Sequence, residues 1–242
     1  MEFLKACIEA NREIYRLLNS KEDLKTALQR GFGGDISLKA DLKAEAIFIR
    51  HLQKFGRIYS EESGLSGIGN DVVVIDPIDG SKNFASNIPY FGSSAALKKN
   101  GEVVCAVVAN FAAGYMNIKY QDCFKRRFFD ERKVQKITLT PLCGVGIFEK
   151  AYQSAKLAPF LLNSSFKYRS LGALALSLSM AYEVDFVLFE GCVREFDIAG
   201  GWYMCENLFR FRDDNFLLVS KDKGIFDKIS NFIKEQGVDG FF

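Results

Sequence analysis

The stretch that decides the fold reads Val72-Val73-Val74-Ile75-Asp76-Pro77-Ile78-Asp79-Gly80-Ser81-Lys82-Asn83-Phe84. Its four β-branched residues, bounded by turn formers, predict a strand that is buried on both faces. Pro77 lacks a backbone N–H and cannot continue a central ladder, so we expect the strand to end there. Asp76 and Asp79 lie three residues apart across a turn that Gly80 can complete. Both carboxylates can therefore converge on one point.

The residues after this strand suit phosphate chemistry. Residues 80–83 are expected to present backbone N–H groups as the first turn of a helix, and such groups bind anions. The two carboxylates are ligands for hard cations such as Mg²⁺. This combination predicts a site for a phosphate ester. The alternative interpretation is a solvated strand-to-helix turn with an aspartate cap, because short acidic spacings are common by chance.

Four segments of the chain resemble the inositol monophosphatase and fructose-1,6-bisphosphatase superfamily. Residues 76–84 match its signature D-P-[IL]-D-G-[ST]-x-N. Three further segments are similar to its other motifs, in the order that the family requires: residues 35–41 (DISLKAD, with Glu45 beyond) to D-x-[VI]-[TS]-x-x-D, residues 59–64 (YSEESG) to G-E-E-S, and residues 196–201 (FDIAGG) to W-D-x-A-A-G. The resemblance implies an α/β (α+β) fold: a two-lobed, layered αβαβα sandwich of the sugar-phosphatase type.

Composition is that of an ordinary globular protein. The chain has 242 residues, 48% of them hydrophobic and 26% charged, which is enough to bury a full core. Its 32 basic and 30 acidic residues leave a net charge of only +2, so no electrostatic footprint for nucleic acid or an anionic membrane is expected. Residues 1–9 alternate charged and apolar side chains and do not resemble a signal peptide. We therefore expect a cytoplasmic protein without a nucleic-acid or membrane partner.

Cysteine and histidine usage narrows the chemistry. The six cysteines show no C-x-x-C pairing, and we interpret them as reduced core residues. The single histidine, His51, falls in a helical pattern and is interpreted as structural. A serine–histidine triad needs histidine, and catalytic zinc sites usually do. Catalysis is therefore expected to depend on carboxylates and metal ions.

Hydrophobic periodicity predicts the elements around the site. In the first lobe we expect a helix over 2–19 that Leu24 and Leu28 continue after a break, a helix over 41–54, a strand over 57–60, a loop over 65–70, and a hairpin of strands 93–98 and 103–109 joined at Asn100-Gly101. In the second lobe we expect helices near 152–160, 171–182 and 198–208, with Asp197 as the cap of the last, and a strand over 184–189. The predicted domains are 1–140, carrying most metal ligands, and 141–242, completing the site.

The resemblance implies a role for each site residue. Glu61, Asp76 and the carbonyl of Ile78 hold a first Mg²⁺, and Asp76, Asp79 and Asp197 hold a second, with a third, weaker ion possible near Glu61. The catalytic residues are then Glu61, Ser81 and Asp41, the last two orienting the attacking water; a simple helix cap is the alternative for Asp41. The substrate-binding residues are Gly80 and Ser81 through their amides, Glu190, which lies seven residues before Asp197 and binds a substrate hydroxyl, and Arg169 in the segment RSLGALAL.

The implied function is a Mg²⁺-dependent, lithium-sensitive phosphomonoesterase acting on a small polyol phosphate, with inositol monophosphate as the first candidate. Fructose 1,6-bisphosphate and 3′-phosphoadenosine 5′-phosphate are the alternatives within the superfamily. The chain departs from the family pattern at Ala173 and Phe196, in the charged and aromatic segment 116–137, and by lacking an E-A-G-G element. A catalytically silent, metal-binding homologue that acts as a binding protein is therefore the alternative of another class. The resemblance also implies a homodimer, with residues 103–129 as the candidate contact.

Overall fold

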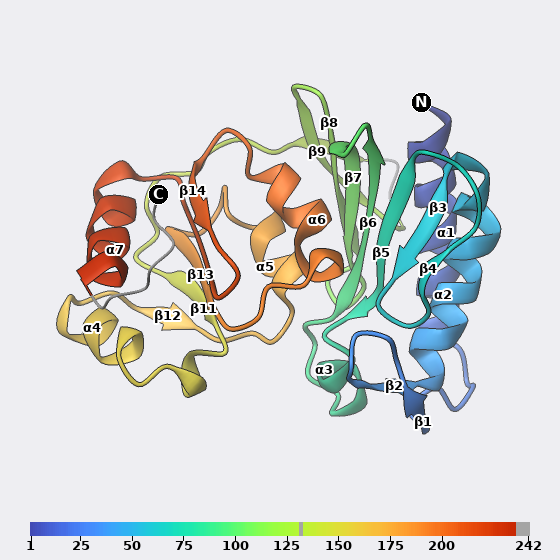
Figure 1. Cartoon of the computed structure of the whole chain (residues 1–242), viewed down its shortest axis with the longest axis horizontal. Helices are drawn as coiled ribbons and strands as arrows, with labels where there is room; N and C mark the ends of the chain where they lie inside the picture. The colour runs from blue at the N-terminus through green and yellow to red at the C-terminus, as the bar shows by residue number, and fades with distance from the viewer. Residues whose placement is uncertain (131–132, 236–242) are drawn as a thin grey trace.

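The computed structural model describes residues 1–130 and 133–235, and it consists of alternating layers of helix and sheet (Figure 1). An eight-stranded sheet contains β3 (Arg57–Ser60), β4 (Gly64–Ser66), β5 (Val72–Asp79), β6 (Gly92–Lys99), β7 (Glu102–Asn110), β8 (Tyr115–Tyr120), β9 (Cys123–Phe128) and β10 (Val134–Lys136). Their order is β10-β9-β8-β7-β6-β5-β3-β4. Among these pairs only β3 and β5 run parallel.

Two helices cover the outer face of this sheet: α1 (Glu2–Leu18) and α2 (Lys39–Leu52). The buried residues of α1, among them Phe3, Cys7 and Ile14, recur at helical spacing, so one stripe of the helix faces the core. They pack in one cluster with Val73 and Ile75 of β5. A hairpin of β1 (Ala27–Arg30) and β2 (Ile36–Leu38) and a short helix η1 (Gln53–Phe55) flank α2.

The second sheet has the order β12-β11-β13-β15-β14. Its strands are β11 (Gly146–Glu149), β12 (Tyr168–Arg169), β13 (Phe186–Glu190), β14 (Phe209–Arg212) and β15 (Phe216–Ser220). Helices α4 (Leu157–Asn163) and α7 (Lys223–Glu235) cover its outer face, where Leu161 and Ile229 pack against Phe148 and Leu188. A short helix, η2 (Ala151–Gln153), lies between β11 and α4.

The middle layer is formed by α5 (Leu174–Ser179) and α6 (Glu195–Met204), which lie between the two sheets (Figure 1). On one side Leu176 and Ala199 pack with Val74 and Val108 of the first sheet. On the other side Leu178 packs with residues of the second sheet. Every residue of α5 is buried, as a layer between two sheets requires. The layers therefore run helix, sheet, helix, sheet, helix, and the predicted αβαβα sandwich is confirmed.

The strand at the heart of the sequence is longer than predicted, because β5 continues through Pro77 to Asp79. Its ladder with β6 shows how this is possible. Asp76 pairs with Ser94 and Asp79 with Gly92, so a three-residue step faces a two-residue step. Such a bulge removes the need for a ladder hydrogen bond at the proline. The expectation that the strand ends at Pro77 was wrong.

Other boundaries also differ from the sequence expectations. Residues 27–30 form β1 instead of continuing a helix, because they pair with β2. Asp197 lies in the first turn of α6, which begins at Glu195, and does not cap it. Part of the predicted 65–70 loop belongs to β4, and the predicted 152–160 helix is divided between η2 and α4.

The cysteines and the histidine are partly as expected. Cys7, Cys105 and Cys205 are buried, whereas three others are exposed, so the core interpretation was wrong for half of them. His51 lies on α2, where its Nε2 is 3.0 Å from Glu13 Oε2 on α1. This contact links the two helices and supports a structural role. Within the described part of the chain, the helices are too short or too polar to span a bilayer.

The segment between β10 and β11 carries the chain from the first sheet to the second. We propose to divide the lobes there, at residues 140 and 141. The helices α5 and α6 come from the second part of the chain but pack on the sheet of the first. The site between the lobes therefore draws residues from both parts.

The position of Gly92 predicts a large loss of stability on substitution. A Cβ atom at Gly92 would lie 1.8 Å from the backbone oxygen of Ala109 and 2.8 Å from Leu176 Cδ2. We expect Gly92→Ala to lower the free energy of unfolding by about 3 kcal/mol or more, the upper range for overpacking. Gly101→Ala, with φ +86° but no atom within 4 Å of its Cβ, should lose only about 1 kcal/mol, the conformational cost. Urea unfolding measures both; equal losses would contradict the packing argument.

Candidate active site

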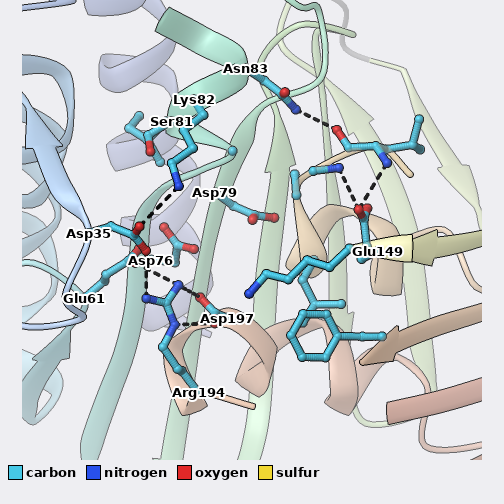
Figure 2. A pocket seen from close by; sticks show the side chains of 18 of the residues that line it. Asp35, Glu61, Asp76, Asp79, Ser81, Lys82, Asn83, Glu149, Arg194 and Asp197 are labelled. Atoms are coloured by element: carbon cyan, nitrogen blue, oxygen red, sulfur yellow. Dashed lines mark hydrogen bonds and ion pairs between the residues drawn. The ribbon is translucent and has the colours of Figure 1, made fainter. Parts of the chain in front are cut away.

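A cavity of about 410 Å³ opens where β5, β11, α3 (Ser81–Ala85) and α6 meet, between the two lobes (Figure 2). Its wall is rich in charge. The acids that line it are Asp35, Asp41, Glu61, Glu62, Asp76, Asp79, Glu149 and Asp197, and the cations are Lys82, Lys150 and Arg194. Acids thus outnumber cations, and an anionic substrate would need further positive charge.

Three of the acids form a compact group. Glu61, Asp76 and Asp197 each offer a carboxylate oxygen, and these oxygens lie within 4.8 Å of one another. The sheet explains two of the three positions. Strands β3 and β5 are parallel, and Ser60 of β3 lies beside Ile75 of β5. The residues that follow these two, Glu61 and Asp76, therefore lie side by side. The first turn of α6 brings Asp197, which is far away in the sequence.

The electrostatics of this group favour either bound protons or a bound cation. Burial, and then the charges of neighbouring acids, raise the pKa of Glu61 to about 8. Burial likewise raises the pKa of Asp76, Asp79 and Asp197. Buried carboxylates this close together do not ionise fully unless positive charge is bound between them.

The donor atoms fit Mg²⁺. Asp76 Oδ1 is buried and has no hydrogen-bond partner in the described structure, and a buried acceptor of this kind needs an explanation. The group offers only carboxylate oxygens, the ligand type that Mg²⁺ prefers. A metal ion would satisfy the orphaned oxygen and the excess negative charge together.

Asp79 completes the wall from the end of β5. Its Oδ2 accepts a hydrogen bond of 2.8 Å from the backbone N–H of Leu176 on α5, which ties the first sheet to the middle layer. Asp79 is not one of the three acids that lie within 4.8 Å of one another, but it lines the same cavity. The charge of Asp197 also contributes to its raised pKa, so the two acids interact.

The turn after Asp79 has the predicted form. Gly80 has φ +85° and precedes α3, and both Gly80 and Ser81 line the cavity, as does Ile78. Glycine is required here, since a Cβ would lie 3.0 Å from the oxygen of Tyr90 in addition to straining the backbone. Asn83 Nδ2 donates to the oxygens of Tyr90 and Leu171, both at 2.7 Å. The first bond fixes the turn within the first lobe, and the second ties it to the second lobe.

Asp41 satisfies both of its sequence interpretations in part. Its Oδ2 accepts a hydrogen bond of 2.5 Å from the N–H of Leu38, so it caps α2. It is also buried in the wall of the cavity, and burial raises its pKa to about 7. A carboxyl group that titrates near neutral pH is suited to proton transfer.

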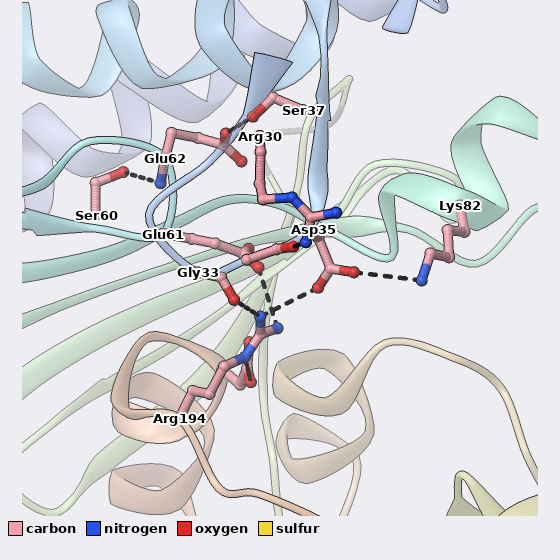
Figure 3. A network of polar contacts seen from close by, with 11 residues as sticks. Arg30, Gly33, Asp35, Ser37, Ser60, Glu61, Glu62, Lys82 and Arg194 are labelled. Carbon is pink, nitrogen blue, oxygen red and sulfur yellow. Dashed lines mark hydrogen bonds and ion pairs between the residues drawn. The ribbon is translucent and has the colours of Figure 1, made fainter. Parts of the chain in front are cut away.

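Sequence reasoning missed several residues of this cavity, among them Arg194 and Glu149. Arg194 lies among the acids, with Nε 2.7 Å from Asp197 Oδ2 and Nη2 3.0 Å from Glu61 Oε1 (Figure 3). Glu149, the last residue of β11, accepts hydrogen bonds from the N–H groups of Leu171 at 3.1 Å and Gly172 at 2.7 Å. The sequence held a signal for each of them. Arg194 is a charge three residues before Asp197, and Glu149 is an acid at the carboxyl end of a parallel strand.

Two predicted substrate-binding residues are not among those that line the cavity. Glu190 ends β13, and its Oε2 is buried without a partner in the described structure. Arg169 is exposed, donates to the oxygen of Tyr168, and lines a separate hollow beside α4. The structure therefore gathers eight of the ten predicted site residues around one cavity: Asp41, Glu61, Asp76, Ile78, Asp79, Gly80, Ser81 and Asp197.

The raised pKa values predict that Mg²⁺ binding strengthens with pH. The pKa of Glu61 is about 8, so at pH 6 Glu61 holds a proton that a metal ion must displace. We expect the dissociation constant of Mg²⁺ to fall roughly tenfold per pH unit for each proton released, up to about pH 8. The metal-free protein should lose stability over the same interval, because the folded state holds this proton more tightly than the unfolded state does. Calorimetric titration from about pH 6 to about pH 9 tests this; pH-independent affinity would contradict it.

Comparisons with known proteins agree with this geometry. The model of the inositol monophosphatase family matches residues 1–208. An inositol-1-monophosphatase of Mesorhizobium japonicum is 31% identical over 112 residues, which span 44% of this chain but only 41% of that protein. The Nus factor SuhB of Xylella fastidiosa is 26% identical over 82% of this chain and 75% of its own length.

A solved structure shows the same fold. The MJ0109 gene product, described as an inositol monophosphatase-fructose 1,6 bisphosphatase, superposes with a TM-score of 0.80 at 22% identity over 96% of this chain and 100% of its own. At this identity the likeness concerns the fold. Since the family model covers most of the sequence and the solved structure shares its layers, the chain belongs to the inositol monophosphatase family.

Proposed function

We propose that this protein is a Mg²⁺-dependent phosphoric monoester hydrolase. The observation that carries the proposal is the group of Glu61, Asp76 and Asp197, in which the buried Oδ1 of Asp76 has no partner among the described residues. The group lies on a cavity that the turn at Gly80 also lines. Carboxylates for metal ions and backbone amides for an anion are thus present on one wall.

The residues would share the work as follows. Glu61, Asp76 and the carbonyl of Ile78 would hold one Mg²⁺, and Asp76, Asp79 and Asp197 a second, and Glu61 could also bind a third, weaker ion. Bound Mg²⁺ supplies an acidified water and charge stabilisation.

The protein itself would position the reacting groups. Ser81 and Asp41 would orient the attacking water, and Asp41 would accept its proton, for which a pKa of about 7 is suitable. The amides of Gly80 and Ser81 would bind the phosphoryl oxygens. Asn83 would keep these amides in place through its two bonds to the neighbouring backbone.

For the substrate we propose a small polyol phosphate, inositol monophosphate first. A cavity of about 410 Å³ lies in the size range of small-molecule sites. Lys150, which follows β11, and Tyr152, in η2, also line it. A sugar bisphosphate or a phosphorylated nucleotide is the alternative, because Lys150 could pair with a second phosphate.

Phosphate release from a panel of phosphomonoesters tests this proposal. We expect hydrolysis with Mg²⁺, loss of activity in EDTA and recovery when Mg²⁺ is restored. The described site holds carboxylates, and none of its side chains carries the double positive charge of Mg²⁺. Inhibition by Li⁺ is a further expectation. Full activity in the chelator would refute the metal mechanism.

The Glu190→Gln variant, run on the same panel, tests recognition separately. If Glu190 binds a substrate hydroxyl, kcat/KM for an inositol or sugar phosphate should fall roughly ten- to a hundred-fold, the effect of losing one charged hydrogen bond. An aryl phosphate without hydroxyl groups should be unaffected. Equal losses on both would show that Glu190 supports the fold instead.

A second candidate function is a metal-binding homologue without catalysis that acts through other proteins. The relative named as a Nus factor supports this candidate, because that relative is similar to 82% of this chain. Mg²⁺ binding without phosphate release from any substrate on the panel would support this function.

We also propose a cytoplasmic homodimer in which residues 103–129 contribute to the contact. Most of β7 and the centre of β8 are already buried within the chain, so this contact would use β9 and the turns beside it. Light scattering at micromolar concentration measures the molecular mass and so distinguishes a dimer from a monomer.

A further inference from the structure

The guanidinium of Arg194 points toward Glu61, Asp35 and the backbone of Gly33 (Figure 3). It makes a forked contact with Asp197, with Nε 2.7 Å from Oδ2 and Nη2 3.0 Å from Oδ1. Nη2 also lies 3.0 Å from Glu61 Oε1. Both carboxylates belong to the group of three acids described above. Arg194 thus neutralises two of the three carboxylates that metal ions would use.

The other end of the guanidinium is attached to the loop between β1 and β2. Nη1 donates to the oxygen of Gly33 at 2.9 Å and lies 3.1 Å from Asp35 Oδ2. The loop itself is fixed against β3, since the N–H of Gly33 donates to the oxygen of Glu61 at 2.7 Å. A Cβ at Gly33 would come within 2.7 Å of Glu61 Cγ and 3.0 Å of Phe196 Cζ, so the loop packs closely on the site.

Arg194 cannot make room for a metal ion by losing its proton. The guanidinium stays charged, as arginine does in proteins generally. A divalent cation bound to Asp197 would lie a few ångströms from this charge and repel it. Mg²⁺ and the guanidinium would compete for the carboxylate of Asp197, so the Arg194 side chain has to move.

We propose that Arg194 is the internal counterion of the metal-free site. It holds Glu61 and Asp197 together before Mg²⁺ binds, leaves both carboxylates when Mg²⁺ binds to Asp197, and keeps its contacts with Gly33 and Asp35 on the loop. The inference rests on the proposed function, because it requires that the acids bind Mg²⁺. Displacing Arg194 then costs part of the free energy of Mg²⁺ binding.

Replacing Arg194 should change metal affinity and metal-free stability in opposite directions. Arg194→Met keeps an unbranched side chain but removes the charge. We expect it to bind Mg²⁺ roughly tenfold more tightly, on the scale of residues that support metal ligands. In EDTA the same variant should unfold at a lower temperature than the wild type, because buried carboxylates lose their counterion. A residue with a purely structural role would lower stability without strengthening metal binding.

Lys82→Met is the matched control. Lys82 lines the same cavity and lies 3.4 Å from Asp35 Oδ1, but its side chain is 89% exposed, and within the described residues its ion pair is with Asp35. Its removal takes one positive charge from the pocket without freeing a proposed metal ligand. We expect its Mg²⁺ affinity to stay within about twofold of the wild type, because exposed pairs contribute little. An equal gain in both variants would show a general effect of charge and overturn the inference.

A spectroscopic readout keeps the test decisive if Arg194→Met does not fold. Arg194→Lys keeps the charge but cannot form the forked contact, and the missing signal in its spectrum assigns the Nε–H resonance of Arg194 in the wild type. Titrating the wild type with Mg²⁺ should shift or broaden that resonance. An unchanged resonance under saturating Mg²⁺, or weaker Mg²⁺ binding in Arg194→Met, would overturn the inference. A wild type that binds no Mg²⁺ would refute the proposed function itself, which distinguishes the two failures.

Discussion

Asp76→Asn is expected to reduce phosphate release by roughly 10³-fold or more, equivalent to about 4 kcal/mol of transition-state stabilisation. Asp76 is the one residue proposed to contact both ions, and its buried Oδ1 has no partner among the residues that the structure describes. Asparagine fills the same volume but directs an NH₂ group, or only a neutral oxygen, at the cations. The measurement is steady-state phosphate release at saturating Mg²⁺.

Two controls accompany this variant. In EDTA, Asp76→Asn should be at least as stable as the wild type, because the pKa of Asp76 is raised by burial and then by its acidic neighbours, and the substitution removes that repulsion. Asp71→Asn changes an acid just before the same strand, paired with Lys99 at 3.5 Å and outside the cavity, and should leave turnover unchanged. An Asp76→Asn protein that retains more than about a tenth of wild-type turnover would contradict the proposed role.

Asp79→Asn and Asp197→Asn are each expected to lower turnover by about 10²-fold or more, and the double variant little further, because residues that serve one ion act as a unit. The two acids are 118 residues apart (197 − 79) but line one cavity. Asparagine can still accept the bond from the N–H of Leu176 at position 79, so the link to α5 should survive.

The double-mutant cycle is informative because it separates one site from two. If the losses multiplied, Asp79 and Asp197 would serve separate ions or separate steps. Thermal unfolding of all three variants in EDTA checks that each remains folded. The interaction between the two acids in the pKa of Asp79 supports a shared site.

The comparison of sequence with structure is clearest at β5. A run of β-branched residues is a local signal, so the buried strand over Val72–Ile75 and the turn at Gly80 were predictable from adjacent residues. The passage of the strand through Pro77 was not, because it depends on a bulge against β6, and the register of a partner strand is not encoded in the strand itself.

The sequence by itself determined the composition of the site: four acids, a glycine turn and no usable histidine, in motifs short enough to be recognised without their surroundings. Only the tertiary structure decided which charges meet. Arg194 reaches the oxygen of Gly33 across 161 residues, and Glu149 holds backbone amides more than 20 positions away. Arg169, whose motif matched the family, lies instead on a separate hollow. The Arg194 contact arises because α6 packs on the first sheet, and the Glu149 contacts arise because the chain before α5 lies beside the end of β11. A pairing between distant segments leaves no periodic or short-range pattern in the chain.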